Sequence, residues 1–203
     1  MATIYLHGFL SSPDSKKGRI LALEHKRRGI PFFAPDLTMS PDQVAAMLAR
    51  FTAGMPPEEL TVVGSSLGGF YATWLAEKTG CRAVLLNPVV RPWELVRDFL
   101  GEQETYGGKR RVVITEDYAD QLLRLDTPAI TMPTRYLVLL STADEVLDWH
   151  EADRKYQTAK RVLVPQGDHQ ISNFDQYSPA ITDFCATRPE AVPSPIVGSV
   201  RCV

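Results

Sequence analysis

The chain has 203 residues, 44% of them hydrophobic, which is enough for one domain with a complete core. Its net charge of −2 argues against nucleic acid or an anionic membrane as the main partner, and no apolar run approaches the roughly 18 residues of a membrane-spanning helix. Neither a metal-ligand spacing nor a phosphate-binding loop occurs, so we expect a protein without a cofactor.

The N-terminus enters the first apolar strand within three residues, and the three cysteines include no C-x-x-C pair. Both features favour a cytoplasmic protein that has no signal peptide and keeps its thiols reduced.

Strands and helices alternate along most of the chain. Six short apolar runs predict buried strands, at 3–6, 31–34, 60–64, 82–86, 135–141 and 161–165. Helical patterns occur at 15–28, after the capping box Ser40-Pro41-Asp42-Gln43, at 69–79 and at 178–186. Strands that alternate with helices are parallel, with right-handed crossovers. We therefore expect one α/β domain over residues 1–186, built on a doubly wound, mostly parallel six-stranded sheet, and we interpret residues 187–203 as a tail that need not be ordered.

The longest gap between predicted strands runs from Pro88 to Thr134, too long for a bare loop. It contains two helical patterns, 92–100 and 116–125, divided by Gly107-Gly108. An insertion here, about 91–128, is expected either to cover the active site as a small lid or to pack on the sheet without a gating role. Its large aromatic residues are candidates for the wall of an acyl pocket or for packing the segment onto the sheet: Trp93, Phe99 and Tyr106.

Residues 64–68 read Gly-Ser-Ser-Leu-Gly directly after an apolar strand, which fits the G-x-S-x-G turn that lifts a nucleophilic serine above a parallel sheet. In that register Ser66 is the nucleophile, because Gly64 and Gly68 stand two residues away on either side, where a Cβ would collide. A plain strand–turn–helix containing two serines is the alternative.

A serine nucleophile needs a histidine base and a carboxylate that orients it, in the chain order Ser, Asp or Glu, His. His169 follows the last predicted strand and is the candidate base, whereas His25 and His150 lie in polar helical stretches and are expected at the surface. Asp144 is the first carboxylate after the preceding strand and the candidate acid. Glu145 and Asp148 compete with it, and Asp148 is the more serious rival, although it could instead cap the next helix. Asp168, adjacent to the base, is expected to shape its own loop.

The oxyanion hole needs two backbone N–H groups. One is expected from Leu67, the residue after the nucleophile, and the other from Phe9, in the His-Gly loop that ends the first strand. His7 is expected to brace that loop.

These stretches resemble the YqiA-like esterases, a small branch of the α/β-hydrolase superfamily, over roughly residues 3–186. The most specific matches are His7-Gly8-Phe9-Leu10-Ser11-Ser12-Pro13 with Ser15 and Lys17, and Leu86-Asn87-Pro88-Val89-Val90-Arg91-Pro92. The resemblance implies a cytosolic bacterial hydrolase with esterase activity, no cofactor, and Ser66, His169 and Asp144 as its triad. One departure is Ser141-Thr142-Ala143, where the family pattern has a glycine before the acid.

The sequence thus predicts a serine esterase that acts on a small-molecule ester. An acyl-thioester hydrolase (acting on acyl-CoA, for example) is the alternative, suggested by the basic run at 109–111 in the insertion. A non-catalytic binding protein on the same fold is the rival from another class.

Overall fold

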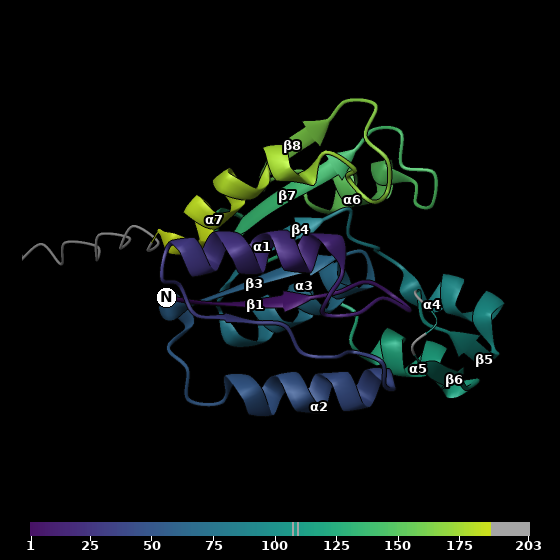
Figure 1. Ribbon diagram of the computed structural model, residues 1–203. Coiled ribbons are helices and arrows are strands. Elements are labelled where there is room, and N and C mark those ends of the chain that lie inside the picture. Colours follow the sequence, from purple (N-terminus) through teal and green to yellow (C-terminus); the bar gives the residue numbers. More distant parts are fainter. Residues whose placement is uncertain (107, 109, 188–203) are drawn as a thin grey trace, which may run out of the picture.

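The computed structural model describes residues 1–106, 108 and 110–187 of the chain. Its centre is a six-stranded sheet in the order β2-β1-β3-β4-β7-β8, in which every neighbouring pair is parallel (Figure 1). The strands are β1 (Ala2–Leu6), β2 (Phe32–Phe33), β3 (Leu60–Ser65), β4 (Arg82–Leu86), β7 (Tyr136–Ser141) and β8 (Lys160–Val164). The predicted fold class and all six predicted strands are confirmed.

Helices cover both faces of this sheet and bury two apolar cores. On one face lie α1 (Lys16–Arg27) and α7 (Ser178–Ala186); on the other lie α2 (Pro41–Thr52), α3 (Leu67–Thr79) and α6 (Trp149–Lys155). Val62 belongs to the core under α2 and α3, and the next residue, Val63, belongs to the core under α1 and α7. This alternation explains why the central strands read as continuous apolar runs, since both of their faces are buried.

The insertion between β4 and β7 is only partly as predicted. Instead of one helix over 92–100, it begins with a single-turn helix α4 (Pro92–Leu95) and a 3₁₀ turn (Val96–Phe99), and an antiparallel hairpin follows, β5 (Gly101–Glu104) and β6 (Arg111–Ile114). Gly101 has φ +95°, a conformation that a helix cannot adopt, so the helical segment ends before the hairpin. The second predicted helix is present as α5 (Asp117–Arg124). Gly107 lies outside the described residues, as does the predicted tail beyond residue 187.

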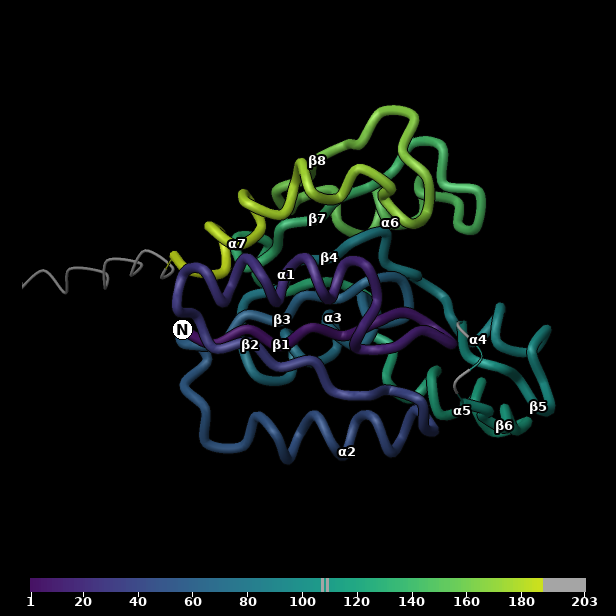
Figure 2. The backbone as a smooth tube through the Cα atoms, in the orientation of Figure 1, coloured from purple at the N-terminus to yellow at the C-terminus, as the bar shows by residue number. Residues whose placement is uncertain are grey.

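The insertion lies beyond the C-terminal end of β1, away from the N-terminus (Figure 2). Three further 3₁₀ turns connect the elements, at Pro57–Glu59, Pro133–Arg135 and Phe174–Gln176. Across the described part of the chain, no helix combines the length and the apolar composition needed to cross a bilayer.

The surface position predicted for His25 is wrong. Its side chain is fully buried between α1 and the sheet, where Nδ1–H donates to the Leu21 carbonyl (2.8 Å) and Nε2 accepts from the Thr3 hydroxyl (2.9 Å). Burial lowers its pKa, so the ring is held neutral. The charged neighbours at 24 and 26–28 concealed that positions 21 and 25 lie one helical turn apart on the inward face of the helix.

Candidate active site

Ser66 lies in the turn from β3 to α3 and has a strained backbone, with φ 54° and ψ −118°. The residues two positions before and after it must be glycine for steric reasons. A Cβ on Gly64 would overlap the carbonyl of Gly68, and a Cβ on Gly68 would overlap the carbonyl of Leu6. The register expected from the sequence therefore matches the turn, whereas Ser65 ends β3 with a buried side chain.

His169 and Asp144 meet at the ends of β8 and β7. The imidazole Nδ1 lies 2.8 Å from Oδ2 of Asp144, whose side chain is only 1% exposed. The other carboxylate oxygen of Asp144 accepts the backbone N–H groups of Val146 and Leu147, both at 2.9 Å. These bonds fix the carboxylate on the imidazole. They also place the ring proton on Nδ1, which leaves Nε2 as an acceptor.

The rival carboxylates have other partners. Asp148 caps α6, accepting the backbone N–H of His150 (3.0 Å) and contacting the His150 ring (2.7 Å) at the surface. Asp168 accepts the backbone N–H (2.7 Å) and hydroxyl (2.5 Å) of Ser172. Glu145, which the sequence offered as a competing acid, instead accepts the backbone N–H of His169 at 2.9 Å, a contact that was not predicted. Of the three candidate acids, Asp144 is the one whose carboxylate is hydrogen-bonded to the His169 ring.

Asn87 supports the histidine loop and was also missed as a functional residue. Its side chain is 3% exposed and its φ is 44°. The amide Nδ2 donates to the carbonyl of His169 (3.0 Å) and to the hydroxyl of Ser141 (3.0 Å), while Oδ1 accepts the backbone N–H of Ser141 (2.8 Å). The signal in the sequence was an Asn-Pro pair directly after a strand, but neither residue predicts contact with a loop 82 positions away.

The His-Gly loop after β1 passes against the serine. A Cβ built on Gly8 would lie 3.4 Å from the Cβ of Ser66 and 4.0 Å from its Oγ, so this loop runs directly beside the serine. Within the described chain the N–H groups of Phe9 and Leu67 donate no hydrogen bond. His7 braces the loop as expected: Nδ1–H donates to the Gly8 carbonyl (2.9 Å), Nε2 accepts the Leu37 N–H (3.0 Å), and burial lowers its pKa.

Ser66 and His169 line one cavity of about 960 Å³. One wall comes from the segment 11–19, and an apolar wall comes from the insertion. Of the three aromatic residues proposed for an acyl pocket, Phe99 and Tyr106 line this cavity. Trp93 does not; its ring packs edge-on against Phe70, with the ring centroids 6.2 Å apart.

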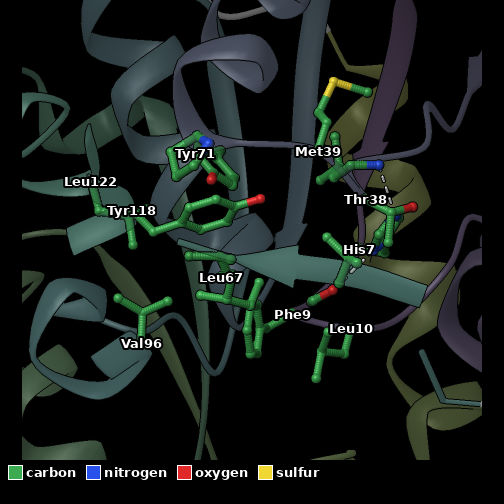
Figure 3. A pocket seen from close by; sticks show the side chains of 15 residues that line it. His7, Phe9, Leu10, Thr38, Met39, Leu67, Tyr71, Val96, Tyr118 and Leu122 are labelled. Atoms are coloured by element: carbon green, nitrogen blue, oxygen red, sulfur yellow. Dashed lines mark hydrogen bonds between the residues drawn. The ribbon is translucent and has the colours of Figure 1, made fainter. Parts of the chain in front are cut away.

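A second pocket, of about 30 Å³, is lined in part by the His-Gly loop (Figure 3). Tyr71 and Tyr118 lie near one another above Leu67 and Phe9 in this view, and Met39 and Thr38 form the opposite side. This space accommodates little more than a water molecule. The larger cavity is therefore the one with room for a substrate.

A parallel sheet with a serine on the turn after β3, and with a carboxylate–histidine pair at the ends of the last two strands, defines the α/β-hydrolase fold. Among the described residues no cluster of three or more His, Cys, Asp or Glu side chains has the geometry to hold a metal ion. The chain belongs to the family described as "Uncharacterised protein family (UPF0227)", whose model matches residues 2–186. This match confirms the resemblance noted in the sequence.

Known proteins support the family and the fold. A UPF0227 protein of Serratia proteamaculans (strain 568) is 24% identical over 185 residues, covering 89% of this chain and 97% of the relative. Est1E from Butyrivibrio proteoclasticus, solved with ferulic acid bound, superposes with a TM-score of 0.65 at 13% identity, covering 91% of this chain and 88% of Est1E. Carboxylesterase CesB from Bacillus subtilis superposes with a TM-score of 0.57 at 11% identity, covering 90% of this chain and 82% of CesB.

Proposed function

We propose that the protein is a serine hydrolase that cleaves carboxylic esters through an acyl-enzyme. The observation that carries the proposal is the 2.8 Å hydrogen bond between Asp144 and His169, at a cavity that also contains Ser66 on its strained turn. Three groups with complementary roles lie on three different strand ends, as a nucleophile, a base and an orienting acid require.

In the proposed reaction the Ser66 hydroxyl attacks the acyl carbonyl, and Nε2 of His169 takes its proton. Asp144 keeps the imidazole in the tautomer that leaves Nε2 free to accept, and it stabilises the imidazolium that forms. The N–H groups of Phe9 and Leu67 receive the oxyanion, helped by the positive end of the α3 dipole. His169 then protonates the leaving alcohol, and a water molecule activated by the same base releases the acid.

The alternative of a thioester hydrolase finds less support. Its signal was the basic run at 109–111. Lys109 lies outside the described residues, Arg110 pairs with Asp36, and Arg111 pairs with Glu102. The charges of the two arginines are thus already matched on the surface. The carboxylesterase CesB shares the fold, which favours an ester as substrate without specifying which one.

A fluorophosphonate probe tests the nucleophile directly. We expect it to label the wild-type protein at Ser66 and to label the Ser65→Ala variant equally, while the Ser66→Ala variant stays unlabelled. His169→Ala should lower ester hydrolysis by several orders of magnitude and leave the fold intact. Labelling that persists in Ser66→Ala, or full activity in His169→Ala, would contradict the proposed mechanism. A matched series of acyl esters and thioesters then separates the two hydrolase activities.

A further inference from the structure

Lys17 is a buried ammonium group in the wall of the substrate cavity, and the proposed mechanism makes no use of it. It lies in the first turn of α1 and lines the cavity that contains Ser66 and His169. The residue is only 6% exposed. Lysine is almost never buried to this extent unless its charge is paired, because the ammonium loses its hydration.

No carboxylate in the described part of the chain lies within 4.0 Å of this ammonium. Its one hydrogen bond goes from Nζ to the carbonyl of Gln170, at 2.8 Å. Asp168 and Asp144 are close enough to favour the charged form electrostatically, but their oxygens are held by Ser172 and by His169. An ammonium has three donors, so two remain for a partner in the cavity.

The cavity that Lys17 lines also contains hydroxyl groups that are free to bind a ligand, whereas its carboxylates are either paired, as Asp36 is with Arg110, or exposed to solvent, as Asp14 is. The hydroxyls of Ser11 and Ser12 line the same cavity, and within the described residues neither makes a side-chain hydrogen bond. The positive end of the α1 dipole faces the same wall, next to its capping residue Ser15. Burial lowers the pKa of Lys17 to about 8, so the group is mostly charged at neutral pH.

We propose that Lys17, with the hydroxyls of Ser11 and Ser12, forms an anion-binding subsite, and that the preferred substrates are esters that carry a carboxylate group. The inference rests on the proposed hydrolase function and adds a substrate class to it. The buried ammonium of Lys17 lies near two carboxylates, those of Asp144 and Asp168, and this local balance of charge suits a monoanion better than a doubly charged phosphate. The carboxylate supplies the counter-charge that the buried ammonium lacks, and the apolar wall of the insertion contacts the rest of the substrate.

Two pairs of esters test this on the wild-type protein. In the first, para-acetoxybenzoate is compared with its methyl ester, which places the charge on the alcohol side. In the second, phenyl hydrogen adipate is compared with phenyl hexanoate, which places the charge on the acyl side. We expect the charged member of at least one pair to have the higher kcat/KM, and the pair that responds identifies the side of the ester that faces Lys17.

The informative variants are Lys17→Met and its matched control Lys26→Met. Lys26 lies on the same helix, α1, is exposed, and does not line the cavity, so its replacement removes the same charge away from the site. A lost hydrogen bond between charged groups corresponds to a drop of about ten- to a hundredfold in the charged-to-neutral ratio of kcat/KM for Lys17→Met. Lys26→Met should keep the wild-type ratio. Lys17→Gln, also without charge, takes the place of Lys17→Met if the latter does not fold.

An equal loss on charged and neutral esters in the Lys17 variants would overturn the subsite and assign Lys17 to tethering the loop after His169. Equal changes in the ratio for both lysine positions would also overturn it. If the wild-type protein hydrolyses none of the four esters, the proposed function fails, and the subsite is then tested by calorimetric binding of the same esters to Ser66→Ala. Tighter binding of the charged esters, abolished by the additional Lys17→Met change, would support the subsite independently of turnover; equal binding of charged and neutral esters would overturn it.

Discussion

The side chain of Asn87 extends the hydrogen-bonded ladder between β4 and β7 past the end of β4, as far as the last residue of β7. Its backbone N–H donates to the carbonyl of Leu139 (3.0 Å), and its Oδ1 accepts the next available N–H group, that of Ser141 (2.8 Å). The amide also donates to the carbonyl of His169. Replacing Asn87 by alanine removes the link between the two strand ends and the loop that carries the base.

The expected loss of stability in Asn87→Ala follows from the hydrogen-bonding groups that are left without a partner. Asn87→Ala leaves the N–H group of Ser141 and the carbonyl of His169 buried and unpaired, and each such group costs about 1–3 kcal/mol. The free energy of unfolding should therefore fall by about 2–6 kcal/mol. Alanine at φ 44° adds about 1 kcal/mol of backbone strain, which glycine avoids. Asn87→Gly should accordingly be about 1 kcal/mol more stable than Asn87→Ala, although both lose the same hydrogen bonds.

Urea-induced unfolding of the three proteins measures both differences, and ester hydrolysis measures the effect on the base. We expect kcat to fall in both variants, because the loop that holds His169 loses its anchor. Variants that unfold within about 1 kcal/mol of the wild-type protein would refute this reasoning, since they would show that water or a shifted loop satisfies these groups at little cost.

Three further outcomes are expected. Gly64→Ala should prevent folding or abolish activity, because its Cβ would overlap the backbone of the following helix. Gly29, by contrast, has open space around it and φ +66°, so the free energy of unfolding of Gly29→Ala should fall by only about 1 kcal/mol in the same urea assay. Trp93→Ala should lower the melting temperature and keep the wild-type preference among ester chain lengths, while Phe99→Ala should change that preference; an unchanged kcat/KM series in Phe99→Ala would contradict its place in the cavity wall. The free energy of unfolding should decrease from about pH 7 to about pH 5.5, because burial lowers the pKa of both His25 and His7 in the folded state and the unfolded chain therefore binds these protons first. A flat profile would show that neither histidine is held neutral.

The sequence was sufficient to predict the sheet and the order of the candidate site residues. Central parallel strands are apolar on both faces, so their runs stand out from the rest of the chain, and the residues that follow them meet at one edge of the sheet. This is why Asp144 and His169, which are 25 positions apart, could be paired before any contact was known. The turn at Ser66 could be predicted equally well, because a Cβ at position 64 or 68 would overlap the backbone and both positions are therefore glycine.

The remaining features depend on contacts that no local pattern encodes. The strand β5 reads Gly-Glu-Gln-Glu, which has no apolar alternation, and only its pairing with β6 makes it a strand. Both residues that anchor His169, Asn87 and Glu145, act through side-chain bonds to distant main chain. The different positions of Phe99 in the cavity wall and of Trp93 in the core likewise depend on tertiary structure. A cavity-lining aromatic residue and a packing aromatic residue give the same pattern in the sequence.

The unpredicted hairpin changes the role that the insertion has in the site. The N–H group of Tyr106, just after β5, donates to the carbonyl of Leu10 at 2.7 Å, and Leu10 itself has a strained φ of 54°. Phe99 packs edge-on against Phe9 with a centroid distance of 5.2 Å, and Arg110 pairs with Asp36 beyond it. The insertion therefore holds the loop that presents the Phe9 N–H, in addition to forming a cavity wall. Because the same contacts support both the wall and the proposed oxyanion donor, changes in the insertion that alter acyl preference should lower kcat as well, and a change confined to KM would show that the two roles are separable.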